Sequence, residues 1–172
     1  MIIKAITMDI TKIGELADAI VNAANESLLG GGGVDGAIHY AAGPGLLEEC
    51  RKLNGCKPGE AKVTKAYGLK NKNIIHTVGP RYDYDPSPAE TLAKCYENSL
   101  RLADELGLKS IAFPSISTGV FGYPLKEAAE ICAKVVCEYK PKNLKHAYMC
   151  IWPEKPYEVD IYNSAFERHK ND

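Results

Sequence analysis

Several familiar signatures are missing from this chain of 172 residues, and each absence argues against a class of function. No Gly-Lys-Ser or Gly-Lys-Thr follows its glycine-rich stretches, and neither stretch gives a clean Gly-x-Gly-x-x-Gly fingerprint with a downstream acid. P-loop nucleotidases and Rossmann dehydrogenases are therefore disfavoured. A Gly-x-Ser-x-Gly elbow is absent as well, which weakens a serine-hydrolase interpretation. Since no linker, repeat or low-complexity stretch is visible, we expect one domain over residues 1–172.

An excess of one charge is also missing. Lys and Arg total 21 against 22 Asp and Glu, for a net charge of −1. This balance argues against non-specific binding to nucleic acid or to a membrane surface. No signal peptide is visible at the N-terminus, and no apolar run approaches the roughly 20 residues of a transmembrane helix. We therefore expect a cytoplasmic protein without a membrane partner.

The cysteines do not form a recognisable metal site. They fall at Cys50, Cys56, Cys95, Cys132, Cys137 and Cys150. None belongs to a Cys-x-x-Cys pair, and no histidine lies beside them at metal-ligand spacing. The sequence predicts buried, reduced thiols and no bound metal.

Strand-like and helix-like stretches alternate along the whole chain. The patterns predict strands at 1–6, 18–23, 61–67, 73–78, 110–113 and 147–152, and helices at 34–42, 44–53, 88–106, 124–139 and 157–168. For the third helix, Ser87 and Glu90 predict a capping box, Pro88 suits the first position, and Gly107 ends the helix. This alternation predicts an α/β fold, a three-layer α/β/α sandwich with a central mixed sheet.

Packing alone does not explain Asn22-Ala-Ala-Asn25, which directly follows an apolar strand. Open α/β sheets bind ligands at the carboxyl ends of their strands, so both amides are placed to hydrogen-bond sugar hydroxyls or backbone. The alternative is that the two asparagines only shape a turn. The residues alone leave both interpretations open.

Four consecutive glycines, residues 30–33, lead straight into an apolar helix. Glycine is costly to order, but backbone without side chains can approach a phosphate or ribose closely. The helix N-terminus adds its positive end and free N–H groups. A flexible loop without function is the alternative. Asp35 either complements the helix dipole or acts as an acid/base group, and His39, one turn later, either orients another group or is simply packed.

A second glycine and hydroxyl loop, residues 114–124, again runs from a buried strand into a helix. Backbone N–H groups in such a loop form an anion nest. Two strand–glycine loop–helix units in one small domain suggest a ligand with two phosphates, hence a diphosphate. Phe121, between Gly119 and Gly122, is either exposed for a purpose or plugs the loop against the core.

Together these segments resemble the macro domain family, and within it the MacroD-type ADP-ribosyl hydrolases. The matching segments are residues 8–11, 18–25, 30–39, 59–64, 75–80 and 110–124. They occur in the order typical of the family and span about residues 3–162. Two departures are visible: Met8 stands where the family usually has glycine, and the insertion with zinc ligands of some microbial members has no counterpart.

The resemblance implies that ADP-ribose binds without a cofactor, with its adenine near Asp9 and Ile10. Asp9 is expected to accept a hydrogen bond from the adenine amino group. Trp152 matches an aromatic position that often stacks on the adenine, although it is equally compatible with a core residue.

The catalytic positions implied by the resemblance are Asn25, Asp35 and His39. Asn25 is expected to hold the distal ribose. Asp35 is tied to catalysis, helping to position or activate water alongside a substrate phosphate, and His39 lies near that acid. The remaining ligand-binding positions implied are Asn22, Ala24, Gly31, Gly32, Gly33, Val34, Ser117, Thr118, Gly119, Val120 and Phe121.

The implied activity is hydrolysis of an ester-type bond at the distal ribose. The expected partners are ADP-ribose and its esters, including O-acetyl-ADP-ribose, and proteins carrying mono-ADP-ribose on Asp or Glu. A non-catalytic ADP-ribose reader is the main alternative, since fold does not determine function. Readers often lack an acid at the position of Asp35. A phosphatase for ADP-ribose phosphate would use the same pocket.

Overall fold

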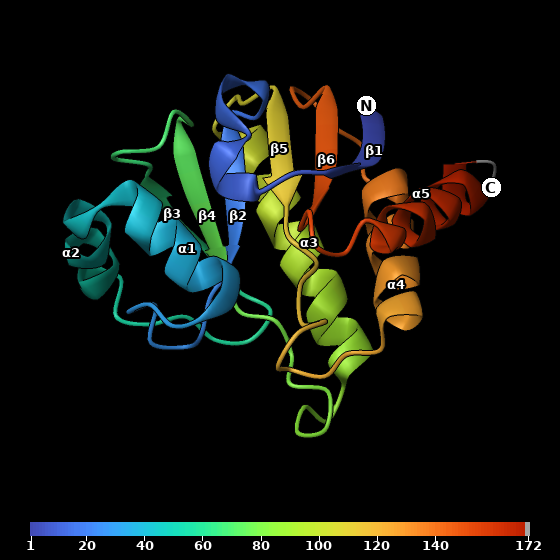
Figure 1. Ribbon diagram of the computed structural model, residues 1–172, viewed down its shortest axis with the longest axis horizontal. Coiled ribbons are helices and arrows are strands. Elements are labelled where there is room, and N and C mark those ends of the chain that lie inside the picture. The colour runs from blue at the N-terminus through green and yellow to red at the C-terminus, as the bar shows by residue number, and fades with distance from the viewer. Residues whose placement is uncertain (171–172) are drawn as a thin grey trace.

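A twisted sheet of six strands forms the centre of the molecule, with helices on both faces (Figure 1). The structure is a computed structural model that describes residues 1–170, so the last two residues of the predicted domain lie outside the described residues. The strands are β1 (Ile2–Thr7), β2 (Ala19–Ala23), β3 (Ala61–Lys65), β4 (Asn73–Thr77), β5 (Ser110–Phe113) and β6 (His146–Ile151). They are arranged in the order β1-β6-β5-β2-β4-β3, and only the β3–β4 pair is antiparallel.

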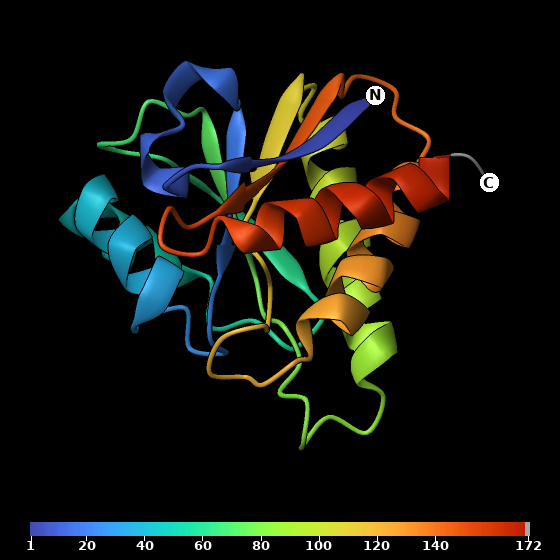
Figure 2. The ribbon, with the colours of Figure 1, turned by 45° about the vertical axis from the view of Figure 1, so that its right-hand side comes forward.

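The helices form two separate layers. On one face lie α1 (Gly33–Ala42) and α2 (Pro44–Lys52), together with two 3-10 turns at Ile10–Lys12 and Gly14–Leu16. The other face carries α3 (Pro88–Glu105), α4 (Leu125–Glu138) and α5 (Tyr157–Lys170), and α4 and α5 run side by side there (Figure 2). The predicted α/β/α sandwich with a mixed sheet is confirmed.

Alternation along the buried strands produces two hydrophobic cores. Ile20, Ile74 and Ala112 pack beneath α1 and α2, whereas their neighbours Val21 and Ile75 pack beneath α3, α4 and α5. Successive side chains of a strand point to opposite faces, so a short apolar run can serve both layers at once. Accordingly, β2 and β5 are apolar at most positions, and β4 has an apolar pair at its centre.

Two local predictions need correction. Ser87 occupies the N-cap of α3 with φ −141° and ψ 66°, but its side chain makes no capping hydrogen bond. Its own N–H instead bonds to Asp85, so the predicted capping box does not form. The third strand ends at Lys65, because Tyr67 adopts a left-handed φ of 52°. Gly107 does end α3, with φ 75° and a bond from Leu108 N–H back to the carbonyl of Ala103.

Among residues 1–170, no helix combines the length and apolar character that a membrane crossing requires.

Candidate functional site

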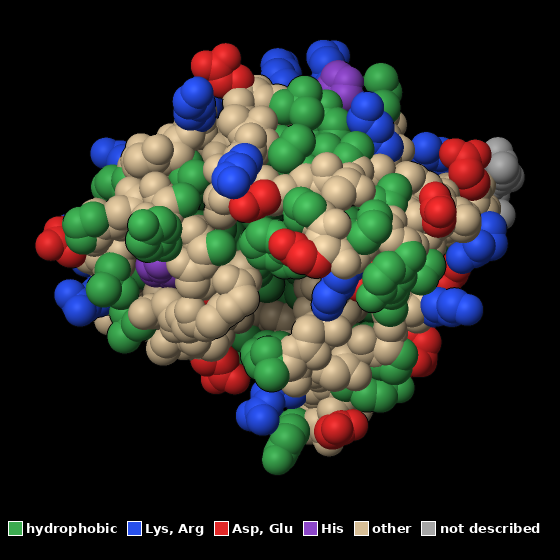
Figure 3. All heavy atoms as spheres, in the orientation of Figure 1, with side chains coloured by type: hydrophobic (Ala, Val, Ile, Leu, Met, Phe, Trp, Pro, Cys, Tyr) green, Lys and Arg blue, Asp and Glu red, His purple; other side chains and the backbone are tan. Residues whose placement is uncertain are grey.

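A cavity of about 440 Å³ opens at the carboxyl ends of the parallel strands. Its position follows from the topology. The chain leaving β2 passes to α1 on one face of the sheet, while the chain leaving the adjacent β5 passes to α4 on the other. Ligands of open α/β sheets bind where neighbouring connections diverge in this way. In Figure 3 the cavity appears as a hollow with hydrophobic side chains inside it.

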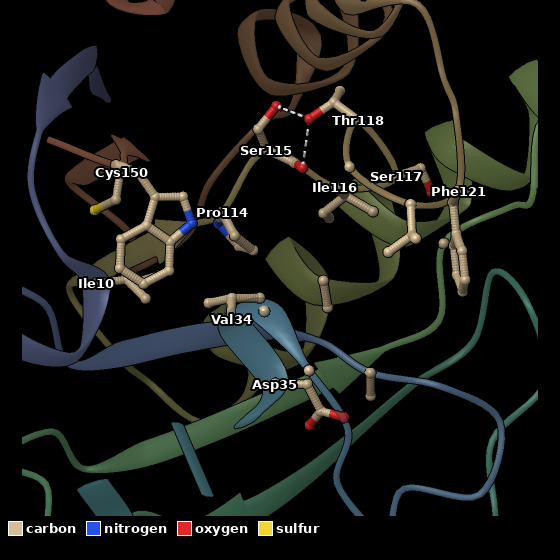
Figure 4. A pocket seen from close by; sticks show the side chains of 18 of the residues that line it. Ile10, Val34, Asp35, Pro114, Ser115, Ile116, Ser117, Thr118, Phe121 and Cys150 are labelled. Carbon is tan, nitrogen blue, oxygen red and sulfur yellow. Dashed lines mark hydrogen bonds between the residues drawn. The ribbon is translucent and has the colours of Figure 1, made fainter. Parts of the chain in front are cut away.

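The cavity brings together most of the predicted site residues. Its wall includes Ile10, Ala24, Asn25, Gly31, Gly32, Gly33, Val34, Asp35, Ser117, Thr118, Gly119, Val120, Phe121 and Trp152. Asp9, Asn22 and His39 are not part of the wall. In Figure 4, Ile10 and Cys150 lie at one end of the cavity and Phe121 at the other, with Val34 facing Pro114 and Ile116 across it.

The first glycine block places the N-terminus of α1 in the cavity wall. Gly32 is the N-cap of the helix, and no side chain satisfies the first N–H groups there. A helix N-terminus with free N–H groups favours an anion. Gly31 lies close to two side chains, since a Cβ atom there would lie 3.2 Å from Oδ2 of Asp35 and 3.3 Å from Nδ2 of Asn25, a tight fit. Two of the three predicted catalytic side chains, Asn25 and Asp35, therefore lie together beside Gly31.

Asn25 also shapes its loop. Its Oδ1 accepts hydrogen bonds from the N–H and hydroxyl of Ser27, while Nδ2 donates to the carbonyl of Gly30 at 2.9 Å. The side chain thus closes an Asx-type turn and borders the cavity at the same time. The two sequence interpretations of Asn25 are therefore compatible.

Asp35 is only 4% exposed although it borders the cavity. Its Oδ1 accepts a hydrogen bond of 2.9 Å from Nδ2 of Asn22 and lies 3.5 Å from Nε2 of His39. Burial raises the pKa of Asp35, while the Asn22 hydrogen bond and His39 oppose this rise. A carboxylate with a raised pKa is a better general base near neutral pH. His39 lies behind this acid, and its Nε2 has no hydrogen-bond partner.

Asn22 was predicted to contact the ligand, but the structure places it outside the cavity wall. The residue has no exposed surface, so it neither reaches the cavity nor shapes a turn. Its side-chain nitrogen lies 2.9 Å from Oδ1 of Asp35 and 3.1 Å from Nδ1 of His76. Position 22 is the fourth residue of β2, within the strand, and its side chain points to the layer of α1 rather than into the cavity.

The second glycine loop folds tightly at Ser117. This residue has a left-handed φ of 66°, and its hydroxyl donates to the carbonyl of Pro80 at 2.8 Å. Gly79 makes room for it, because a Cβ atom on Gly79 would lie 2.2 Å from Oγ of Ser117. Gly79 itself borders the cavity and was not among the predicted site residues. Its position directly after β4, in Val78-Gly79-Pro80, was the available signal.

A side chain of helix α5 holds the loop at residues 114–124 through a hydrogen bond. Tyr162 has no exposed surface, and its hydroxyl lies 2.5 Å from Oγ of Ser115. Oγ of Ser115 lies 2.7 Å from Oγ1 of Thr118. The Thr118 hydroxyl donates to the backbone carbonyl of Ser115 (Figure 4). The hydroxyls thus hold the loop from inside, and its backbone lines the cavity. Val120 is fully exposed.

The opposite end of the cavity is apolar. Ile10 and Cys150 are buried, and Trp152 is half-buried, borders the cavity and belongs to neither hydrophobic core. Asp9 uses Oδ1 to accept hydrogen bonds from the N–H and hydroxyl of Thr11. Several further residues of this wall were not among the predicted binding residues, namely Met8, Ala23, Pro114, Ser115, Ile116, Cys150, Ile151, Lys155 and Glu158, although the loop at 114–124 had been singled out. Apolar residues such as Ala23 and Ile151 carry little sequence signal because they resemble core residues, and charged residues such as Lys155 and Glu158 resemble ordinary surface residues.

The cysteines are all unpaired, five of them buried and Cys137 half-buried. Burial raises the pKa of every one of these thiols, for example that of Cys50 to about 11. A raised pKa makes a thiol a poor nucleophile or metal ligand. Within residues 1–170, no group of three or more His, Cys, Asp or Glu side chains is arranged to hold a metal ion.

A family model described as the macro domain matches residues 21–132, which is more than half of the chain. The chain belongs to the macro domain family. The matched region contains both glycine loops and Asp35. This macro domain is 51% identical over 168 residues to a macro domain-containing protein of Chlorobaculum tepidum, covering 96% of the chain and 95% of that protein.

A second relative carries an enzyme name. The macro domain is 51% identical over 147 residues to human ADP-ribose glycohydrolase MACROD2, covering 83% of the chain but only 35% of that protein. The chain therefore spans about a third of the length of this relative. Among solved structures, a mutant macrodomain of Oceanobacillus iheyensis with ADPR superposes with a TM-score of 0.88. It is 39% identical, and the match covers 98% of the chain and 93% of that structure.

Proposed function

We propose that this macro domain binds ADP-ribose and hydrolyses an ester-type bond at the distal ribose. The main observation in support of this proposal is the position of Asp35. A buried carboxylate, Asp35, borders the cavity beside Asn25 and the free N-terminus of α1. A relative named ADP-ribose glycohydrolase and a solved neighbour with ADPR support it.

The chemistry of the cavity wall suggests the direction of the ligand. Adenine would occupy the apolar end, near Ile10 and Trp152, with Asp9 accepting a hydrogen bond from its amino group. The diphosphate would lie between the N-terminus of α1 and the loop at residues 117–121, where backbone N–H groups are available. Because the distal ribose follows the diphosphate in the ligand, it would reach Asn25 and Asp35.

In the proposed reaction, a water molecule is held between Asp35 and a phosphate oxygen of the bound substrate. Asp35 accepts a proton from this water as its oxygen attacks the ester carbonyl carbon. The bond from that carbon to the ribose oxygen breaks, the ribose oxygen takes the proton from Asp35 to become a hydroxyl, and the acyl group leaves as a carboxylic acid. Pinning the sugar through Asn25 keeps the ester close to the water, which lowers the barrier through proximity.

The proposed substrates are proteins with mono-ADP-ribose on Asp or Glu and the small ester O-acetyl-ADP-ribose. Both present an ester carbonyl on the distal ribose, so one mechanism covers both. A reader that binds ADP-ribose without turnover is the second candidate. A phosphatase for ADP-ribose phosphate has no separate support in the cavity.

A turnover assay tests the proposal directly. Purified protein is given mono-ADP-ribosylated protein or O-acetyl-ADP-ribose, beside Asp35→Ala and, as a matched control, Asp160→Ala, an exposed acid on α5. We expect wild type and Asp160→Ala to release ADP-ribose and Asp35→Ala to be inactive, while ADP-ribose affinity changes less than about tenfold. No turnover by wild type, with ADP-ribose still bound in calorimetry, would establish a reader instead.

A further inference from the structure

A buried histidine lies directly beside the residue that holds Asp35. In the parallel pairing of β2 and β4, Asn22 is the register partner of His76. Both side chains have no exposed surface, and neither borders the cavity. His76 therefore has no route to a bound ligand, yet it is separated from the proposed general base by one amide group.

With Asp35 ionised, as its proposed role of general base requires, the hydrogen bonds around His76 admit one arrangement of protons. The amide nitrogen of Asn22 has two protons, and it lies 2.9 Å from Oδ1 of Asp35 and 3.1 Å from Nδ1 of His76. An ionised carboxylate can only accept, so the amide must donate to Asp35. Its second proton then goes to Nδ1, which must be an acceptor and therefore unprotonated.

The other ring nitrogen completes the chain. Nε2 of His76 lies 3.0 Å from Oγ1 of Thr64, and that hydroxyl donates to the carbonyl of Lys65 at 3.0 Å. Because the hydroxyl has only one proton, it must accept a hydrogen bond from Nε2–H of His76. The ring is thus a neutral Nε2–H tautomer, anchored to the backbone of β3 and turned with its acceptor towards Asn22.

The surroundings of the ring keep it neutral. Its neighbours are Asn22 from β2, Thr64 from β3, Cys50 from α2 with Sγ 3.9 Å from Nε2, and His39 from α1 with ring centroids 6.5 Å apart. None of them carries a negative charge against the ring. Burial, followed by His39, lowers the pKa of His76 to about 3.

We propose that His76 is a positioning residue for the hydrolysis, which fixes the Asn22 amide so that this amide directs the Asp35 carboxylate. Without an acceptor at Nδ1, the amide of Asn22 is free to rotate about its last side-chain bond. Its second proton is then buried without a partner, and its Oδ1 has none either, so the amide can shift away from Asp35 to find another acceptor. Asp35 then loses the hydrogen bond that sets its direction. This inference rests on the proposed catalytic role of Asp35.

A set of three variants separates positioning from packing. His76→Leu removes both ring hydrogen bonds, His76→Gln keeps one acceptor and one donor, and His146→Gln changes a histidine at the opposite, amino-terminal end of β6. We expect His76→Leu to lower kcat about 100-fold, as small misplacements of a catalytic group do. ADP-ribose affinity and KM should stay within about threefold, because none of these atoms borders the cavity.

His76→Gln should recover at least about a tenth of the wild-type kcat, and His146→Gln should match wild type. An unchanged kcat in His76→Leu would overturn the proposal. So would equal losses in His76→Leu and His76→Gln, or a loss of ADP-ribose affinity that parallels the loss of kcat. If His76→Leu does not fold, Thr64→Val provides a second test, because it retains the ring but removes the hydroxyl that anchors Nε2–H; it should lower kcat less than His76→Leu with unchanged ADP-ribose affinity, and an unchanged kcat would overturn the proposal.

A spectroscopic readout does not depend on turnover. Nitrogen NMR of the histidine rings in the wild-type protein should show His76 as a neutral Nε2–H tautomer throughout about pH 5 to 8. A protonated Nδ1, or titration of this ring within that range, would overturn the proposal even in a catalytically active protein. If the wild-type protein lacks turnover altogether, the proposed function fails, whereas the tautomer measurement still reports on the hydrogen-bond chain itself.

Discussion

Gly79 and Ser117 approach each other so closely that a Cβ atom on Gly79 would lie 2.2 Å from Oγ of Ser117. The same Cβ would lie 2.6 Å from Cγ2 of Ile116. Ser117 cannot easily yield, because its hydroxyl is bound to the carbonyl of Pro80 and its backbone is left-handed. The conformation of the loop at residues 117–121, which we propose binds the diphosphate, therefore depends on Gly79, a residue of the segment that follows β4.

Replacing this glycine should damage the loop more than the fold. We expect Gly79→Ala to weaken ADP-ribose binding by about tenfold or more, since overpacking of this kind costs roughly 1–3 kcal/mol. Calorimetric titration measures the change. Gly107→Ala serves as a control for lost stability, because its φ of 75° strains an alanine there, whereas the residue precedes the amino-terminal end of β5, away from the cavity at the carboxyl ends. Equal affinities for wild type and Gly79→Ala would show that the loop adapts.

Asp35→Asn should lower the hydrolytic activity and raise the thermal stability of the protein at neutral pH. Because burial raises the pKa of Asp35 above its unfolded value, its charged form is disfavoured in the folded state. A raised carboxyl pKa contributes stability below the unfolded value near 4, and this contribution is lost as the pH rises through the folded pKa. At pH 7 the variant should therefore unfold at a higher temperature than wild type, with the advantage shrinking below about pH 4.

The same variant should lose at least about 100-fold in kcat, because an amide cannot accept the proton from water. It keeps an oxygen that can accept from Asn22. Thermal unfolding at several pH values and a turnover assay together test both parts. A variant that is less stable than wild type at neutral pH contradicts the role of burial.

Tyr162→Phe removes the hydroxyl that holds Ser115, at 2.5 Å, while the ring keeps its place in the core. We expect a loss of about 1 kcal/mol in unfolding free energy, typical of a deleted internal hydrogen bond. ADP-ribose affinity should fall by a few fold, since Tyr162 holds Ser115, and Ser115 is hydrogen-bonded directly to Thr118 in the cavity wall. Denaturant unfolding and calorimetry are the measurements. Unchanged affinity alongside lower stability would restrict Tyr162 to packing.

Trp152→Ala tests the adenine end of the cavity. If adenine stacks on the indole, the substitution should cost roughly 1–3 kcal/mol of ADP-ribose affinity, the usual size of a base–aromatic contact. Trp152→Phe keeps an aromatic face and should recover most of the loss. Ribose 5-phosphate, which has no adenine, provides a ligand control whose weak affinity should not change. Equal affinity of wild type and Trp152→Ala for ADP-ribose would remove the indole from the site.

His76 should make the fold sensitive to acid. Its pKa of about 3 in the folded protein lies below the usual value of 6.5. As the pH falls from about 6.5 towards 3, the unfolded chain binds a proton on this ring and the folded protein does not. The free energy of unfolding therefore decreases over this interval, by an amount on the order of a few kcal/mol. His76→Gln removes this dependence, so its unfolding free energy should fall less steeply over that interval. Parallel curves for the two proteins would contradict the prediction.

Local sequence information determined the strands, the helices and the glycine loops. Apolar runs of four to six residues such as β5 are short enough to be strands, and Pro44, Pro88 and Gly107 mark helix limits through their fixed or permissive backbone. The glycine block before α1 predicted an anion-binding helix end, because that motif lies within a few consecutive residues. The resemblance to the macro domain family added Asp9 and implied specific roles for Asn25 and Asp35, in each case by position along the chain.

Only the tertiary structure decided which side chains meet. Asn22 reads as a ligand contact in sequence because it adjoins the end of a strand, yet register with β4 places it against His76, 54 residues away. Gly79 meets Ser117, and Tyr162 meets Ser115, through crossovers that no local pattern encodes. Local propensity acts over a few residues, whereas sheet order, register and helix docking result from burial of the whole core. The hydrogen bonds from Asn22 to Asp35 and to His76 therefore form only when β2 and β4 pair in the correct register.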